Sequence, residues 1–454
     1  MHTTRREHVA VVLAVVTCLA LAPACSGSAS DADLRADPTA PADASVVSAP
    51  TSTAPAPRDD GSVVAAHAGE RWFLGTVPAG ATAADLSLAP IRLGMINQED
   101  TPLGSYPEIR AAVEAAIAWV NAELGGVAGR PVELVPCVTR FDPDESRRCA
   151  EALADDGVVA FVGGVDVNSS ESTRVIEERG LVTIGGIPAT LAEQRSPNTF
   201  TFSGGDAGAL AAFMSYAAAR GDRRVALAYG QEVDSFEVAA RDYGAVVGRS
   251  LGLDVDLVPY SIFTTDFTPL VREVVQQGDD SLMVLAATSS CVPVMTAAAA
   301  SSLPLFLTGA CAGDETTRAA GAAAQGVVFN AEGPVDGLDI EASIYQEVVE
   351  RYADEPAGGA GTVSFRGFMN LYSLMLDLGP DAVTSAALAA LARQAVGRPS
   401  FWGHPFTCDG QQVPGLPALC APQQVLFTLA DGGSGFTSVS GFIATDELFA
   451  AALR

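Results

Sequence analysis

The residues best suited to chemistry stand at the end of a short glycine-rich segment, Gly163–Ser170, with the sequence GGVDVNSS. The segment follows the apolar run Val158–Val162 and leads into a predicted helix. Backbone N–H groups and the helix dipole favour a bound anion at such a point, and Asn168, Ser169 and Ser170 add hydrogen-bond donors. The alternative is that one serine only caps the helix, and the two roles are compatible because its neighbour can still face a ligand.

The composition removes most catalytic chemistry. All 26 basic residues are arginines, so neither a Schiff-base lysine nor a phosphate-binding P-loop lysine exists. Of the four histidines, only His404 falls in a predicted domain, where aromatic residues and Pro405 flank it. No GxSxG or HExxH motif occurs, and no GxGxxG follows a strand. A secreted hydrolase would have to use carboxylates alone, so we expect no enzymatic activity and no cofactor.

The charge balance argues against nucleic acid as a partner. The formal net charge is −28 over 454 residues, and an acidic surface repels phosphate backbones. The hydrophobic content of 48% is ample for a folded core.

The first residues are typical of an export signal. Arg5 and Arg6 precede the apolar run Val9–Ala22, which is too short to span a bilayer and ends shortly before Cys25. Residues 1–25 resemble a lipoprotein signal peptide whose Cys25 becomes the acylated N-terminus; an ordinary signal peptide cut nearby is the alternative. Residues 26–66, rich in Ala, Pro and Ser, are predicted to be a disordered tether.

The remaining cysteines form three pairs that are close in sequence. These pairs are Cys137 with Cys149, Cys291 with Cys311, and Cys408 with Cys420. Export favours disulfides. A metal site is the alternative, but no CxxC occurs and the six residues are scattered, so we expect three disulfides and no metal.

Beyond residue 90, strands and helices alternate in two similar series, which predicts an α/β fold with parallel sheets. The first series of strands comprises Ile91–Ile96, Val132–Val135, Val158–Val162, Leu181–Ile184 and Thr199–Phe202. The second comprises Arg224–Tyr229, Val255–Tyr260, Leu282–Ala287, Leu305–Thr308 and Gly326–Asn330.

The stretch Pro107–Gly164, and above all its run WVNAELGGVAGRPVELV, resembles the opening of the type I periplasmic binding proteins, the leucine/isoleucine/valine-binding family of ABC-importer receptors. The resemblance implies two lobes, each a mostly parallel sheet flanked by helices, joined by a three-crossover hinge. It places a ligand-binding domain at residues 88–454. Lobe 1 is expected at about 88–205 and 334–400, and lobe 2 at about 206–333 and 401–454. The crossovers are expected near Ser203–Asp206, Ala331–Asp336 and Phe401–Gln423.

Ligands of open α/β sheets bind beyond the carboxyl ends of the strands, which identifies the candidate loops. In lobe 1 the candidate ligand-binding residues are Tyr106, Asn168, Ser169, Ser170, Ile187, Ala189 and Thr190. In lobe 2 they are Asp234, Ser235, Phe236, Ser289, Ser290 and Asp314.

The resemblance also assigns roles within these loops. In the family, the loop corresponding to Gly163–Ser170 holds a ligand carboxylate, and an acidic residue after the fourth lobe-2 strand holds an ammonium group. That acidic position falls near Cys311 in this chain, so Asp234 or Asp314 would have to replace it. Asp314 could equally cap the next helix, and a neutral polar ligand fits the hydroxyl groups as well.

These observations predict the substrate-binding component of an ABC importer that captures a branched-chain or other amino acid, a related amide or an organic acid. Its expected partners are the small-molecule ligand and ABC permease subunits. We expect a monomer, lipid-anchored on the outer face of the cytoplasmic membrane. A ligand-sensing lipoprotein of the same fold is the alternative, and a secreted hydrolase is the second.

Overall fold

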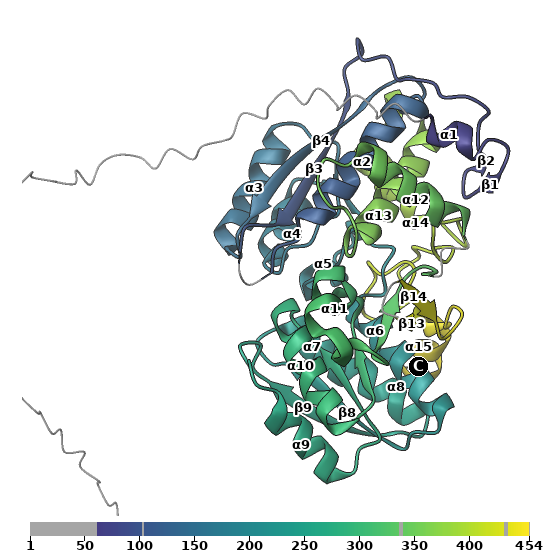
Figure 1. Cartoon of the computed structure of the whole chain (residues 1–454). Coiled ribbons are helices and arrows are strands. Elements are labelled where there is room, and N and C mark those ends of the chain that lie inside the picture. Colours follow the sequence, from purple (N-terminus) through teal and green to yellow (C-terminus); the bar gives the residue numbers. More distant parts are fainter. Residues whose placement is uncertain (1–60, 102–103, 336–338, 431–434, 454) are drawn as a thin grey trace, which may run out of the picture. The chain divides into compact units, whose positions relative to one another are not determined.

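The computed structural model describes residues 61–101, 104–335, 339–430 and 435–453 (Figure 1). The predicted signal peptide, Cys25 and most of the predicted tether lie outside these residues. The described part contains two large sheets, one per lobe. Among the described residues, no helix combines the length and apolar character needed to cross a bilayer.

Lobe 1 is built on a parallel sheet of order β4-β3-β5-β6-β7. Its strands are β3 (Ile91–Gln98), β4 (Val132–Thr139), β5 (Ala160–Val162), β6 (Thr183–Ile184) and β7 (Thr199–Phe200). The helices are α2 (Pro107–Glu123), α3 (Pro143–Asp155), α4 (Ser169–Glu178), α5 (Leu191–Arg195), α12 (Ile340–Tyr352), α13 (Gly361–Leu378) and α14 (Ser385–Arg393), with the 3₁₀ turn η4 (Pro380–Ala382).

Helices cover both faces of this sheet. Residues of α2, α12 and α13 share one apolar core with Leu93 and Met95 of β3, and the three helices lie together in Figure 1. Ile96, whose side chain alternates to the other face, packs with α3 and α4. A parallel sheet buried on both faces explains the continuous apolar strands of the sequence.

Lobe 2 has a sheet of order β14-β13-β12-β11-β10-β8-β9, in which only β13 and β14 are antiparallel to their neighbours. The strands are β8 (Arg224–Gly230), β9 (Asp254–Tyr260), β10 (Ser281–Leu285), β11 (Leu305–Leu307), β12 (Val328–Ala331), β13 (Val425–Leu429) and β14 (Phe436–Ser438). The helices are α6 (Gly205–Arg220), α7 (Asp234–Val238), the π-helix η1 (Ala239–Gly244), α8 (Ala245–Ser250), α9 (Thr268–Gln277), α10 (Thr288–Ser301), α11 (Asp314–Ala320) and α15 (Thr445–Leu453), with 3₁₀ turns η2 (Gly309–Ala312) and η3 (Gly321–Ala324).

The chain passes between the lobes three times. It leaves lobe 1 between β7 and α6, returns between β12 and α12, and enters lobe 2 again between α14 and β13. The last passage contributes to both cores, since Phe401 and Phe406 pack in lobe 1 while Leu416 and Leu419 pack in lobe 2. The predicted two-lobed α/β fold with a three-crossover hinge is therefore confirmed.

An N-terminal extension packs onto lobe 1 ahead of the first large sheet. It consists of α1 (Val63–Ala66) and a hairpin of β1 (Arg71–Trp72) and β2 (Gly75–Thr76). Val63 and Val64 are buried in the lobe-1 core. The predicted tether, residues 26–66, therefore extends too far at its C-terminal end. The two core valines were not recognised because the surrounding sequence is rich in Ala.

Glu123, at the end of α2, anchors this extension. Its carboxylate accepts hydrogen bonds from the Ser62 hydroxyl, the Val63 and Val64 backbone N–H groups, and the Tyr352 hydroxyl. Burial raises the pKa of Glu123, but these hydrogen bonds outweigh it and hold that pKa below its usual range. The charged form therefore stabilises the fold above the ordinary titration range of Glu, and this stabilisation is lost as the pH falls through it.

We predict that Glu123→Ala lowers the free energy of unfolding at pH 7 by about 3 kcal/mol, because several buried donors lose their acceptor. Urea denaturation measures this loss. Glu178→Ala on α4, which removes an exposed carboxylate paired with Arg174, is the control and should change stability by less than about 1 kcal/mol. Equal effects of the two substitutions would contradict the anchoring role of Glu123.

The structure contains the three predicted disulfides, Cys137–Cys149, Cys291–Cys311 and Cys408–Cys420. The first joins β4 to α3 and the second joins α10 to η2. Within the described residues there is no cluster of three or more His, Cys, Asp or Glu side chains arranged for a metal ion.

Replacing both Cys137 and Cys149 by serine should lower the free energy of unfolding by about 3 kcal/mol, since the unfolded chain regains a closed loop. The urea midpoint of the double variant, compared with that of the oxidised parent, measures the effect. An unchanged midpoint would show that this bond does not constrain the chain.

Candidate ligand-binding site

A cavity of about 1360 Å³ lies between the two lobes and is lined by both. Its walls come from strand-end loops, as expected for parallel sheets, and from the segments that cross between the lobes. Ligand pockets in proteins usually measure about 300–1,000 Å³, so this cavity has room for a molecule larger than a simple amino acid. Its aromatic lining includes Tyr106, Phe236, Tyr345, Trp402 and Phe427.

The N-terminal end of α4 forms part of the lobe-1 wall. Asn168 occupies the position before the helix, makes no capping bond, and lines the cavity together with Ser170. The Asn168 side-chain Nδ2 atom is buried and has no hydrogen-bond partner among the described residues. A helix start with unused donors can bind an acceptor such as a carboxylate.

Buried hydrogen bonds hold this loop in place. Asn97 Oδ1 accepts from the Val165 N–H at 3.2 Å, and Gln98 Oε1 accepts from the Val167 N–H at 3.4 Å. Asp166 Oδ1 accepts from the Asn168 N–H at 2.9 Å. Asn97, Gln98 and Asp166 do not line the large cavity themselves. They hold the loop in place from outside it.

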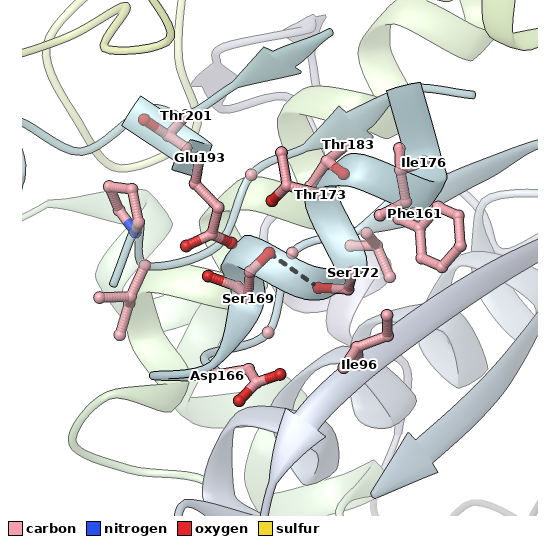
Figure 2. A pocket seen from close by; sticks show the side chains of 16 residues that line it. Ile96, Phe161, Asp166, Ser169, Ser172, Thr173, Ile176, Thr183, Glu193 and Thr201 are labelled. Carbon is pink, nitrogen blue, oxygen red and sulfur yellow. Dashed lines mark hydrogen bonds between the residues drawn. The ribbon is translucent and has the colours of Figure 1, made fainter. Parts of the chain in front are cut away.

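A second, small cavity of about 30 Å³ lies between α4 and the carboxyl ends of β5 and β6, with room for about one water molecule (Figure 2). Figure 2 shows Ser169, Asp166 and Glu193 around it. Burial, with a smaller contribution from Asp166, raises the pKa of Glu193 to about 7 despite its hydrogen bonds. Glu193 and Thr190 form a reciprocal capping box at the start of α5, and this box positions the loop of Ala189 and Thr190.

Two hydrogen bonds join the lobes directly at the cavity. The Tyr106 hydroxyl of lobe 1 lies 3.0 Å from Thr288 Oγ1 of lobe 2. The Ser235 hydroxyl of lobe 2 donates to the Ala189 carbonyl of lobe 1 at 3.0 Å. Both contacts would break if the lobes moved apart.

Most of the residues predicted from the sequence line the large cavity. They are Tyr106, Asn168, Ser170, Ile187, Ala189, Thr190, Asp234, Phe236 and Asp314. Asp234 is the first residue of α7, and Asp314 is the first residue of α11. Both carboxylates are exposed and lie on the cavity wall.

Four of the predicted residues do not line the large cavity. Ser169 is 2% exposed and bonds to Thr190 at 2.9 Å, behind the wall. Ser235 is buried by its bond to Ala189. Because α10 begins at Thr288, Ser289 and Ser290 already follow helical geometry: Ser289 is exposed to solvent and Ser290 is buried inside lobe 2.

A charged cluster that was not predicted from the sequence lies where the hinge meets the cavity. Asp206 lies in the first turn of α6, Glu332 follows β12, and Arg366 lies on α13; all three line the cavity. Glu332 accepts from the Ser203 hydroxyl at 2.6 Å and lies 3.6 Å from the Arg366 guanidinium. Asp206 and Glu332 lie in segments that were predicted to cross between the lobes, and this position could have identified them as cavity residues. Nothing in the apolar sequence of α13 indicated Arg366.

Carboxylates dominate the charged lining of the large cavity. Among the described residues they are Glu171, Asp206, Glu232, Asp234, Asp314, Glu332 and Glu347. Arg366 is the one Arg or His side chain among the described lining residues. The whole chain has 54 acidic and 26 basic residues, so this seven-to-one ratio exceeds the general acidity of the protein.

Comparison with solved structures supports the fold. A fatty acid ABC transporter substrate-binding protein from Thermomonospora curvata superposes with a TM-score of 0.64 at 17% identity, covering 82% of this chain and 97% of that one. A leucine-binding protein from Thermotoga maritima gives 0.63 at 18% identity, covering 79% and 99%. A solute-binding protein from Rhodopseudomonas palustris HaA2, in complex with p-hydroxybenzoic acid, gives 0.66 at 17% identity, covering 81% and 100%.

A search of curated protein sequences gave no match. The family model for periplasmic binding proteins matches residues 90–407, a span that includes the parallel strands of both sheets, most of the residues that line the large cavity, and the first two passages between the lobes. By this match, this chain belongs to the periplasmic binding protein family.

Proposed function

We propose that this protein is the extracytoplasmic substrate-binding component of an ABC importer and captures a small organic ligand between its lobes. The observation that carries the proposal is the 1360 Å³ cavity, lined by both lobes beside a three-segment hinge. Hinge closure buries a ligand on all sides, and the closed form presents a surface that a permease can recognise. The ligand is bound and released without chemical change.

The lobe-1 wall supports a ligand with an acceptor group such as a carboxylate. Asn168 and Ser170 offer donors at the start of α4, and the aromatic side chains opposite offer apolar contact. Amino acids, amides and aliphatic or aromatic organic acids all have this chemistry. The related solved structures include proteins described as binding leucine, fatty acids and hydroxybenzoate, which spans the same range.

We also propose that Cys25 carries a lipid anchor after removal of residues 1–24, and that the protein acts as a monomer at the outer face of the cytoplasmic membrane. The support is the sequence of the signal region, which lies outside the described residues. The Ala-, Pro- and Ser-rich segment after Cys25 then links the anchor to the N-terminal extension.

A thermal-shift screen of amino acids, amides and organic acids tests the proposed function. A compound present at about 100 times its dissociation constant should stabilise the protein by about 2.7 kcal/mol. Ala310→Trp should abolish the shift because Ala310 lines the cavity. Ala300→Trp is the matched control, since Ala300 is exposed on α10 away from the cavity. Hits that survive Ala310→Trp would place binding elsewhere and contradict the proposal.

The two hydrogen bonds between the lobes should contribute to closure over the ligand. We predict that Tyr106→Phe weakens the binding of a screen hit about fivefold, the effect of losing one hydrogen bond of about 1 kcal/mol, with little change in stability. Isothermal titration calorimetry measures the affinity. Tyr260→Phe removes a hydroxyl that donates to the Leu285 carbonyl within lobe 2, so it should lower stability and leave affinity unchanged. The reverse pattern would exclude Tyr106 from closure.

A further inference from the structure

We infer that the hinge end of the large cavity is a cation site, in which Asp206 and Glu332 bind a protonated amine of the ligand. The inference rests on the proposed function and assigns a ligand chemistry to it. It differs from the sequence-based expectation, in which Asp234 or Asp314 would hold an ammonium group at the end of a lobe-2 strand.

The cluster has one more carboxylate than it can neutralise internally. Arg366 is 4% exposed and its guanidinium is used by Glu332 at 3.6 Å and by the Phe202 carbonyl at 2.9 Å. Glu332 is also held by the Ser203 hydroxyl. Asp206 makes no side-chain hydrogen bond or ion pair with any described residue. The charge of Glu332 is thus matched by that of Arg366, and Asp206 remains as an unpaired carboxylate on the cavity wall.

The environment of Asp206 penalises its negative charge. Burial, together with the charge of Glu332, raises the pKa of Asp206 to about 7. Among the described residues, the charged group that acts on Asp206 is Glu332, from the segment after β12, and Glu332 in turn pairs with Arg366 of α13. A cation placed between Asp206 and Glu332, which are both half-buried, would remove this penalty because it can pair with both carboxylates.

The alternative is that Asp206 only stabilises the start of α6, where a carboxylate interacts favourably with the helix dipole. The two explanations predict opposite effects of Asp206→Asn on the ligand-free protein. A raised pKa means that the carboxyl stabilises the fold below its unfolded pKa and that this stabilisation is lost as the pH rises through about 7. The Asn variant should therefore be more heat-stable than the parent at pH 8, whereas a dipole role makes it less stable.

Aromatic side chains beside the cluster complete the site. The rings of Tyr345 and Trp402 lie 5.2 Å apart at 33°, and both line the cavity. Gly403, next to Trp402, packs against the Arg366 side chain, with a Cβ position 3.1 Å from Arg366 Cδ. An alkylammonium or arylammonium group can pack its apolar part on these rings and direct its charge at the carboxylates. The ligand class is therefore an amine with an apolar body, with or without a carboxylate at its other end.

The test uses two pairs of probes that differ by an ammonium group: hexylamine against 1-hexanol, and 6-aminohexanoate against hexanoate. Isothermal titration calorimetry with the purified protein at pH 8 should show that the ammonium improves affinity about ten- to a hundredfold in each pair. Asp206→Asn should abolish this gain. Asp155→Asn, which removes an exposed carboxylate of α3 outside the cavity, should retain it. At pH 5.5 the gain should shrink in the parent protein, because Asp206 is then protonated while the amines stay charged.

The melting temperature of ligand-free Asp206→Asn at pH 8 accompanies the titrations and shows that the variant is folded. The inference is overturned if the ammonium gives no gain in the parent, if the gain survives Asp206→Asn, or if that variant melts below the parent. If hexanoate or 1-hexanol binds and the ammonium group does not improve the affinity, the cation site is overturned and the proposed ligand-binding function is retained. A parent that binds none of the four probes and no compound of the screen contradicts both.

Discussion

The arrangement of the whole binding domain depends on how closely three chain segments pass one another between the lobes. A Cβ atom on Gly204 would lie 2.7 Å from the Pro422 carbonyl oxygen, and one on Gly333 would lie 2.4 Å from the Trp402 carbonyl oxygen. Neither distance is possible for a real side chain, so glycine is required at both positions. The close passage brings the first segment against the third, and the second against the third, at one edge of the cavity. We expect the lobes to close over a ligand about this edge, since three segments connect the two cores and the first two of them are short.

The same edge accounts for the unusual electrostatics of the cavity. Asp206 stands at the start of α6, just after the first crossing segment, and Glu332 follows the end of β12, in the second. Both side chains line the cavity between the lobes. Glu332 and Arg366 form an ion pair, whereas Asp206 is left without a partner among the described residues. A protein selected only for stability would neutralise such a group. The free carboxylate is instead consistent with a binding site whose partner is the ligand.

Much of the fold could be predicted from the sequence because its signals are local. The helix after Pro107 shows helical periodicity, the strands are short apolar runs, and glycine pairs end them. The crossover near Ser203–Asp206 was visible as a glycine-rich break between a strand and a helix. The strand-end rule then located Asn168, Ser170 and Thr190, because parallel strands deliver their following loops to one edge.

The parts that escaped prediction depend on tertiary contacts. Ser290 was placed in the site because the start of α10 could not be located to within a residue, and a shift of one or two positions turns a side chain from the cavity into the core. Arg366 lies within a long apolar helix, where nothing local distinguishes a cavity-facing position. Val63 and Val64 are two valines in an Ala-rich region, and only their contacts with lobe 1 show that the domain begins there.

The central claim is that the two lobes close over a ligand held between them. The most direct measurement is the distance between spin labels at Glu178→Cys on α4 of lobe 1 and Gln277→Cys on α9 of lobe 2, both exposed positions. Addition of the tightest-binding compound should replace a broad distance distribution by a narrower and shorter one. A compound that binds in the cavity and leaves the distribution unchanged would contradict the account.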